Sequence, residues 1–133
     1  MAFPLNEEVI RGDDYPLEFI FYDEASDGTL TPTDISLFNW HYTAKRSLSD
    51  ADDDATIVLD TADMTLDADP DTTKNPTAVV NRLTLWLPST ITATMSGDYV
   101  HDLQSVEIAS GRIQTRGIGQ LTITDQVTQR TTA

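Results

Sequence analysis

The sequence is divided into short runs in which apolar and polar residues alternate, and Gly, Asp, Asn and Pro separate these runs at fairly regular spacing. Alternation with a period of about two residues is typical of half-buried strands, whereas signals for amphipathic helices are almost absent. Thr, Val, Ile and aromatic residues, which favour strands, recur along the chain. The pattern therefore predicts an all-β protein, either a sandwich or a barrel.

The number and spacing of the runs predict about seven antiparallel strands in a single domain that spans residues 1–133. The expected strands lie within residues 7–11, 15–23, 35–47, 55–60, 79–88, 98–108 and 111–128. The sequence Pro-Ser-Thr at residues 88–90 predicts one short helical turn near residues 88–95. The sequence Ala-Ser-Gly at residues 109–111 predicts a hairpin between the last two strands.

Within the expected strands, alternation divides the large side chains between two faces. In the run YPLEFIFYD, Phe19 lies on the more apolar face, and in the run FNWHYT, Trp40 shares a face with Tyr42. Leu85 lies on the leucine-rich face of the run NRLTLWL. The residues that we expect in the core are Phe19, Trp40, Leu85, Tyr99, His101 and Leu103.

The balance of charge excludes several classes of partner. The chain has 22 acidic and 8 basic residues, which gives a formal net charge of −14. We expect no nucleic acid and no membrane as partners, because both are anionic and their capture needs clustered lysines and arginines. No apolar run approaches the roughly 20 residues of a membrane-spanning helix, and no signal peptide is apparent. The absence of cysteine excludes disulfides and thiol catalysis.

One aspartate cluster has the composition of a metal site. The candidate ligands are Asp50, Asp52 and Asp54, which could bind calcium. An EF-hand loop that began at Asp50 would need Gly and Glu where this chain has Ala55 and Thr61. A solvated acidic turn that prevents edge-to-edge strand pairing is the favoured interpretation. We therefore expect no bound metal and no cofactor.

The pair His101-Asp102 is the most suggestive combination for acid–base chemistry. Adjacent residues on a strand point to opposite faces, so the two side chains are not expected to form a pair. We expect His101 to point inward with Tyr99 and Leu103. The chain has no G-x-S-x-G motif and no glycine-rich phosphate loop, and the closely spaced glycines at 117 and 119 indicate a β-bulge. We expect the protein not to be an enzyme.

A series of short motifs points to a known family. Gly12-Asp13 precedes an aromatic strand that ends in Asp, and a tryptophan-bearing strand and the sequence LPST at residues 87–90 follow. The chain continues with GDYVHDLQ, GRIQTRG and GQLTITDQVT. In these motifs, over residues 8–128, the chain resembles the small immunoglobulin-like domains of tailed-phage virion proteins. The N-terminal domain of phage baseplate upper proteins, together with fibre and adaptor modules, is the nearest comparison.

The resemblance implies an immunoglobulin-like β-sandwich in a structural virion protein without an active site. Two residue positions agree with that fold. Tyr99 stands two residues before the inward position His101, as the corner tyrosine of such a sandwich does, and Trp40 has the place of the tryptophan of strand C. Since the chain has no cysteine for the usual inter-sheet bridge, apolar packing has to replace it.

Two segments are expected to lie outside the core. The N-terminal residues 1–7 include Phe3, Pro4 and Leu5, which we interpret either as an apolar docking tip or as an ordinary flexible end. Residues 60–76 are polar and contain two prolines, so we expect an acidic loop there.

These observations favour a non-enzymatic structural component of the virion, assembled in the host cytoplasm, that binds other virion structural proteins and copies of itself. The resemblance favours a tail, baseplate or fibre-attachment adaptor. The small size and the acidity are also compatible with a decoration protein on the capsid surface. A third alternative is a small carbohydrate-binding module, in which Trp86 and Tyr22 would stack on sugars.

Overall fold

The computed structural model describes residues 2–47, 49 and 55–125, and within them the chain is mostly β. The strands are β1 Phe3–Pro4, β2 Glu7–Ile10, β3 Tyr15–Ile20, β4 Tyr22–Glu24, β5 Leu30–Pro32, β6 Phe38–Lys45, β7 Ile57–Asp60, β8 Met64–Ala68, β9 Val80–Leu87, β10 Gly97–Glu107 and β11 Ile113–Thr124. The helical elements are the 3-10 helices η1 Ile35–Leu37 and η3 Thr61–Asp63 and the helix α1 Ser89–Thr92. The described residues thus form more strands than the seven predicted.

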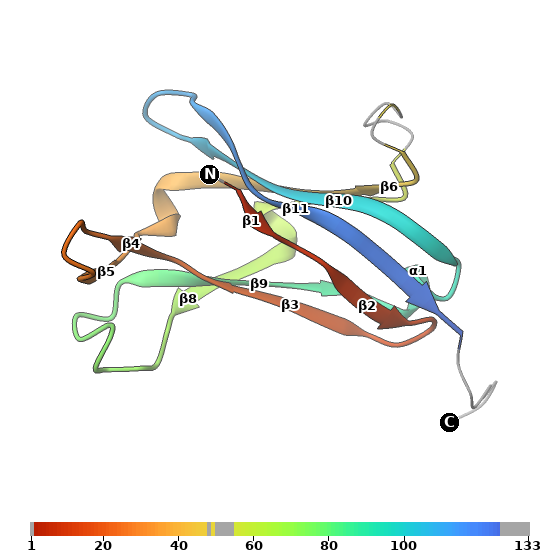
Figure 1. The fold of residues 1–133 in the computed structure, drawn as a ribbon, viewed down its shortest axis with the longest axis horizontal. Helices are drawn as coiled ribbons and strands as arrows, with labels where there is room; N and C mark the ends of the chain where they lie inside the picture. The colour runs from red at the N-terminus through yellow and green to blue at the C-terminus, as the bar shows by residue number, and fades with distance from the viewer. Residues whose placement is uncertain (1, 48, 50–54, 126–133) are drawn as a thin grey trace.

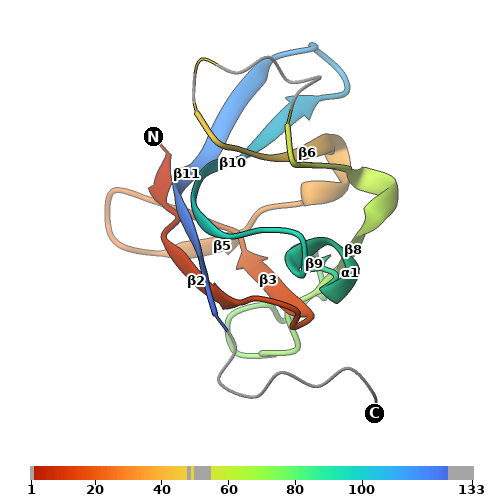
Figure 2. The ribbon, with the colours of Figure 1, turned by 90° about the vertical axis from the view of Figure 1, so that its right-hand side faces the viewer.

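The strands form three sheets. The largest has six strands in the order β1-β11-β10-β6-β7, and β2 also pairs with β11. A second sheet has the order β3-β9-β8, and β4 and β5 form a separate pair. The six-stranded sheet is mixed rather than antiparallel, because β1 and β2 both run parallel to β11. In Figures 1 and 2 the six-stranded and three-stranded sheets lie in two layers, with α1 at one end.

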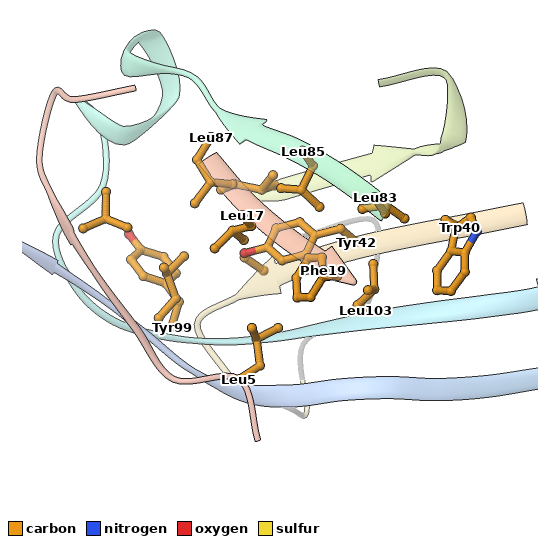
Figure 3. Packing of buried hydrophobic residues seen from close by; sticks show 14 of the residues in the cluster. Leu5, Leu17, Phe19, Trp40, Tyr42, Leu83, Leu85, Leu87, Tyr99 and Leu103 are labelled. Carbon is orange, nitrogen blue, oxygen red and sulfur yellow. The ribbon is translucent and has the colours of Figure 1, made fainter. Parts of the chain in front are cut away.

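One apolar cluster lies between these two layers (Figure 3). Alternation along β6 and β9 sends every second side chain into it, so Trp40, Tyr42 and Leu85 are almost completely buried. All six residues that we expected in the core are buried, and the indole Nε1 of Trp40 donates a hydrogen bond to the carbonyl oxygen of Ile35 at 3.0 Å. Burial of a tryptophan therefore leaves no unsatisfied donor.

The N-terminal segment is not the separate tip that we expected. Phe3 and Pro4 form β1, which pairs with Gly117 and Ile118 of β11, and Leu5 is buried in the apolar cluster. The ring of Phe3 lies 5.7 Å from that of Phe19, measured between centroids. The segment is apolar because it covers the edge of the core, which removes the reason for interpreting Phe3, Pro4 and Leu5 as a docking tip.

The predicted acidic loop at residues 60–76 is also wrong in its first half. Residues 61–68 form η3 and then β8, which pairs with β9 from Met64 to Ala68. Met64 and Leu66 pack against the apolar cluster. Acidic and polar neighbours hide this short apolar alternation in the sequence, and only the part after Ala68 is a loop.

The remaining local predictions agree with the structure. The helical turn after Pro88 is α1, and the hairpin between β10 and β11 turns at residues 108–112. The predicted bulge is confirmed, because the register between β10 and β11 shifts beside Gly117 and leaves Arg116 as an extra residue on β11. This shift determines which way Arg116 points.

Candidate functional site

His101 lies on β10 with its side chain buried, and its ring has two hydrogen-bonding partners. The hydroxyl oxygen of Tyr42 lies 2.7 Å from Nδ1, and the carbonyl oxygen of Leu5 lies 2.7 Å from Nε2. A carbonyl oxygen only accepts, so Nε2 carries the hydrogen and donates it, and Nδ1 accepts from Tyr42. Burial lowers the pKa of His101 and raises that of Tyr42. Both groups are held neutral.

This arrangement joins the N-terminal segment to the core and leaves no free ring nitrogen for chemistry. Asp102 lies on the opposite, outer face of β10, half-exposed and in register with Thr43 and Ile118. The pair is therefore divided between the two faces, as alternation predicts. His41, the second histidine, is exposed on the outer face and pairs in register with Asp60 and Gln104.

The candidate calcium ligands Asp50, Asp52 and Asp54 lie outside the residues that the structure describes. Among the described residues, no group of three or more His, Asp or Glu side chains is placed to hold a metal ion.

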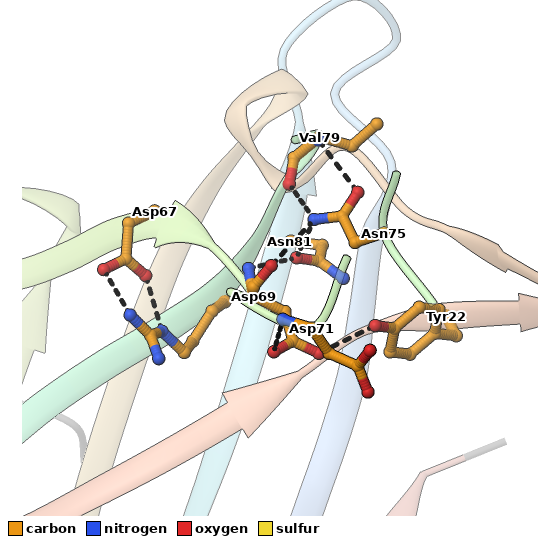
Figure 4. Close-up of polar contacts among 8 residues, drawn as sticks. Tyr22, Asp67, Asp69, Asp71, Asn75, Val79 and Asn81 are labelled. Carbon is orange, nitrogen blue, oxygen red and sulfur yellow. Dashed lines mark hydrogen bonds and ion pairs between the residues drawn. The ribbon is translucent and has the colours of Figure 1, made fainter. Parts of the chain in front are cut away.

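A second polar cluster fastens the loop between β8 and β9 (Figure 4). The buried side chain of Asn81 accepts hydrogen bonds from the backbone amide of Asp69 and from Nδ2 of Asn75. Asn75 bonds in turn to both backbone groups of Val79, at 2.9 Å each. Tyr22 donates to the Asp69 carboxylate at 2.7 Å. These contacts close the loop against the sheet, so we interpret the cluster as structural.

Among the described residues, Trp86 is the aromatic side chain that is most open to solvent. It is 54% exposed on the outer face of the three-stranded sheet, opposite Pro16 on β3. Tyr22, by contrast, is half-buried and its hydroxyl is engaged with Asp69. The two aromatic residues proposed for sugar stacking therefore differ, and only Trp86 presents an open ring.

The end of the molecule where β10 and β11 turn has exposed apolar side chains. Leu37 is 58% exposed and Ile108 61% exposed, and both line a hollow of about 250 Å³. The backbone amide of Ile108 donates to the carbonyl oxygen of Leu37, which fixes the two side by side. Ile113, the first residue of β11, is 66% exposed. We call this surface, with Phe38 and Glu107, the hairpin end.

A groove of about 350 Å³ opens beside this hollow and shares Glu107 with it. It is lined by Asp23, Thr33, Phe38, Ser105, Glu107, Arg112, Gln114 and Arg116, and we call it the Arg116 groove. The guanidinium carbon of Arg116 lies 5.1 Å from the ring centroid of Phe38 and 5.8 Å from that of Trp40. Burial lowers the pKa of Arg116, and the nearby Asp23 carboxylate acts in the opposite direction.

Sequence reasoning missed the hairpin end and the Arg116 groove. Strict alternation along β11 does not place Arg116, because the bulge before Gly117 changes its side. The pair of glycines indicated that bulge, but its effect on Arg116 depends on pairing with β10. The exposure of Leu37 depends on η1, which separates it from the alternating run that follows.

Two comparisons with known proteins gave no match for this chain. No protein-family model matches it, and no curated protein matches it significantly. Among the described residues, no helix is long and apolar enough to cross a membrane.

Proposed function

We propose that this protein is a non-enzymatic structural component of a tailed-phage virion that acts as an adaptor in the tail, baseplate or fibre attachment. It would bind other virion structural proteins, and copies of itself, through surface contacts. The proposal rests on the short motifs in which the chain resembles phage immunoglobulin-like domains and on the exposed apolar side chains of the hairpin end. The protein would be located in the assembled particle.

The strand order supports an immunoglobulin-like sandwich as the fold of this adaptor. In such a domain, strands G, F and C form one sheet with C′ added in the variable type, and B, E and D belong to the other. The order β11-β10-β6-β7 and the order β3-β9-β8 correspond to these two sets. Trp40 on β6 and Tyr99 on β10 have the positions of the strand-C tryptophan and the corner tyrosine. The N-terminal strands depart from the scheme, because both pair with β11.

The single observation that supports protein–protein contact best is the hairpin end. A chain of net charge −14 exposes Leu37 and Ile108 together there and adds Ile113 on the neighbouring strand. Isolated exposed apolar residues are ordinary, but a group that lines one hollow is typical of a contact surface. Contacts of this kind need no catalytic group.

The test is incorporation into particles. Mass spectrometry of purified virions should find the chain at about six to eighteen copies per particle, the multiplicity of a tail or baseplate with cyclic symmetry. Roughly hundreds of copies would instead indicate capsid decoration. Absence from the particle would overturn the virion assignment as a whole.

A charge in the hollow should then remove the chain from the particle. We expect Ile108→Asp to reduce incorporation by more than about tenfold, because a buried unpaired carboxylate is costly at an interface. Ile10→Asp is the matched control, since Ile10 is 48% exposed on β2, away from the hairpin end. Equal incorporation of both variants would place the contact elsewhere on the surface.

Trp86 favours one second candidate, a carbohydrate-binding module. Its exposed ring on the outer face of the three-stranded sheet is the kind of surface on which a sugar ring stacks. A glycan array with the wild-type protein and Trp86→Ala tests this alternative. A glycan that binds the wild type and loses at least about tenfold in affinity for the variant would support it. Absence of any binding would exclude carbohydrate binding for the glycans on the array.

A further inference from the structure

The guanidinium of Arg116, beside the hairpin end, is held in place by three neighbouring side chains. Its Nε donates to the hydroxyl oxygen of Ser105 at 2.9 Å, and Ser105 is itself buried. The guanidinium lies over Phe38 and near Trp40, so its plane is set by two aromatic rings and one hydrogen bond. A guanidinium held in this way loses little conformational freedom when it binds a ligand.

The two Nη nitrogens of Arg116 form no hydrogen bond with the described residues. Arg11 and Arg82 each form an ion pair with an aspartate, and Arg46 donates to the carbonyl oxygen of Asp98. Arg116 makes only the Nε bond to Ser105 among the described residues, so both Nη groups keep their donors. A half-desolvated arginine with unused donors favours a planar, bidentate acceptor, and a carboxylate is such a group.

The groove lining contains two cations and two acidic residues. Arg112 and Arg116 both line it, on a chain that has only 8 basic residues in total. Of the two acidic residues in the lining, Glu107 accepts a hydrogen bond from the Ser110 hydroxyl at 2.5 Å. Asp23 acts on Arg116 through its charge but forms no ion pair with it. The hydroxyl is neutral and leaves Glu107 charged, so an incoming carboxylate would meet two cations opposed by Asp23 and Glu107, and the unused Nη donors of Arg116 are what favour its binding.

We infer that the Arg116 groove binds the carboxylate of a glutamate or aspartate side chain presented by a partner protein. This inference rests on the proposed adaptor function, since it names what the hairpin end recognises. The carboxylate would accept hydrogen bonds from the Nη groups of Arg116, which Ser105 and the two aromatic rings hold in place.

The neighbouring hollow selects a peptide as the source of that carboxylate. The groove and the hollow of Leu37 and Ile108 share Glu107, so one ligand can occupy both. In an extended peptide, side chains on one face are about 6–7 Å apart. An acidic residue in the groove and an apolar residue two positions away would therefore fit the adjacent sites. A free anion or an acidic sugar would leave the apolar hollow empty.

The inference can be tested by titrating the purified chain with a blocked hexapeptide that has one glutamate two residues before a leucine. The side-chain Nε resonance of Arg116 in ¹⁵N-correlated NMR spectra should shift in a saturable manner. The same peptide with glutamine in place of glutamate should bind at least about tenfold more weakly, because the charge-assisted bonds are lost. Sodium acetate and sodium glucuronate test a free anion and an acidic sugar. If either binds as tightly as the peptide, the inference of a peptide ligand is wrong.

Two variants should change the affinity in opposite directions. Arg116→Lys keeps the charge but loses the planar fork, so we expect about tenfold weaker peptide binding. Asp23→Asn removes one of the two opposing carboxylates, so binding should tighten by about threefold. Asp23 is on β4 at the surface, which makes this variant informative even if Arg116→Lys folds poorly. Unchanged affinity in Asp23→Asn, or in a folded Arg116→Lys, contradicts the inference.

The matched control is Arg46→Lys. Arg46 also stacks on an aromatic ring, 4.1 Å from the centroid of Tyr99, but it follows the opposite end of β6 from Phe38. Its replacement should leave peptide affinity unchanged, and an equal loss there would show that the effect does not depend on the Arg116 groove, which overturns the inference. Failure of the peptide to bind, with the chain still found in particles, would remove this inference while leaving the proposed function in place.

Discussion

Two segments of this chain look loosely attached in the sequence, and the structure fastens both in different ways. The N-terminal residues 3–10 add two short parallel strands to the edge of the largest sheet. The loop at residues 69–79 joins β8 to β9 without strand pairing of its own. Each segment has a buried polar side chain as its anchor, His101 for the first and Asn81 for the second.

The anchors differ in what accompanies them. Around His101 the N-terminal segment also buries Leu5, packs Phe3 on Phe19 and passes close above two glycines of β11. Around Asn81 the loop has mainly hydrogen bonds, to Asp69, Asn75 and the carbonyl oxygen of Phe21. Apolar burial and close packing contribute more free energy than exchanged hydrogen bonds do. The first segment should therefore be an integral part of the fold, and the second a locally fastened loop.

The largest effect is expected where the N-terminal segment crosses β11. A Cβ atom at Gly119 would overlap the backbone carbonyl group of Leu5, which hydrogen bonds to Ile118 and His101 hold in place. Gly119→Ala should therefore lower the free energy of unfolding by about 3 kcal/mol, as measured by urea denaturation.

Gly117→Ala is the matched comparison for this effect. There the added Cβ would meet the ring of Phe3, a side chain that can rotate away. We expect a clearly smaller loss than for Gly119→Ala. Equal losses would show that the N-terminal segment is not held by the close approach at Gly119.

The sequence predicts the parts of the fold that depend on alternation alone. Trp40, Tyr99 and Leu103 face the core because every second residue of a strand does. The burial of Leu5 was missed because its reason lies far along the chain, at Gly119 and His101. No local pattern contains a contact between residues that are separated by almost the whole domain.

The same limit explains the site. The position of Arg116 depends on one extra residue in β11 relative to β10, and its partners Phe38 and Ser105 come from two other strands. The exposed pair of Leu37 and Ile108 likewise joins η1 to the end of the hairpin. Alternation identifies the faces of single strands, but grooves form where several elements end together.

Removal of the loop's buried anchor, Asn81, should have a moderate effect on stability. Asn81→Ala removes the acceptor of the Asp69 amide and the donor to the Phe21 carbonyl oxygen, and the site is fully buried. Unsatisfied buried groups of this kind cost about 2 kcal/mol. Hydrogen exchange should accelerate at the amides of Asp69 and Val79 and remain slow in β10. Uniform acceleration across the domain would contradict the description of the loop as locally fastened.

The stability that His101 contributes as the anchor of the N-terminal segment should decrease as the pH falls. Burial lowers the pKa of His101 below its ordinary value of 6.5, so the unfolded state binds the proton more readily than the folded state does. The stability that neutral His101 contributes is therefore present above about pH 6.5 and is lost as the pH falls below it. From about pH 7.5 to about pH 5.5, the loss should not exceed about 1.4 kcal/mol per pH unit.

Urea denaturation across this pH range measures the effect, and two variants assign it. His101→Gln should remove this part of the pH dependence, whereas His41→Gln, which changes the exposed histidine on the outer face, should retain it. If the pH dependence disappears with His41→Gln and persists with His101→Gln, protonation of His101 is not its cause and the prediction is wrong.

The smallest effect is expected at the outer margin of the loop cluster, where Tyr22 donates its hydroxyl to the carboxylate of Asp69 at 2.7 Å. This hydrogen bond is the main cause that lowers the pKa of Asp69, and the backbone amide of Asp71 adds to it. Tyr22→Phe should therefore raise the pKa of Asp69 toward its ordinary value, which a ¹³C NMR titration of the carboxyl group measures. The melting temperature near neutral pH should fall less than in Asn81→Ala, because both groups are in contact with water, which replaces the lost bond. An unchanged pKa for Asp69 would contradict the role assigned to the Tyr22 hydrogen bond. A destabilisation as large as that of Asn81→Ala would mean that the loop is held from its surface and not from its buried asparagines.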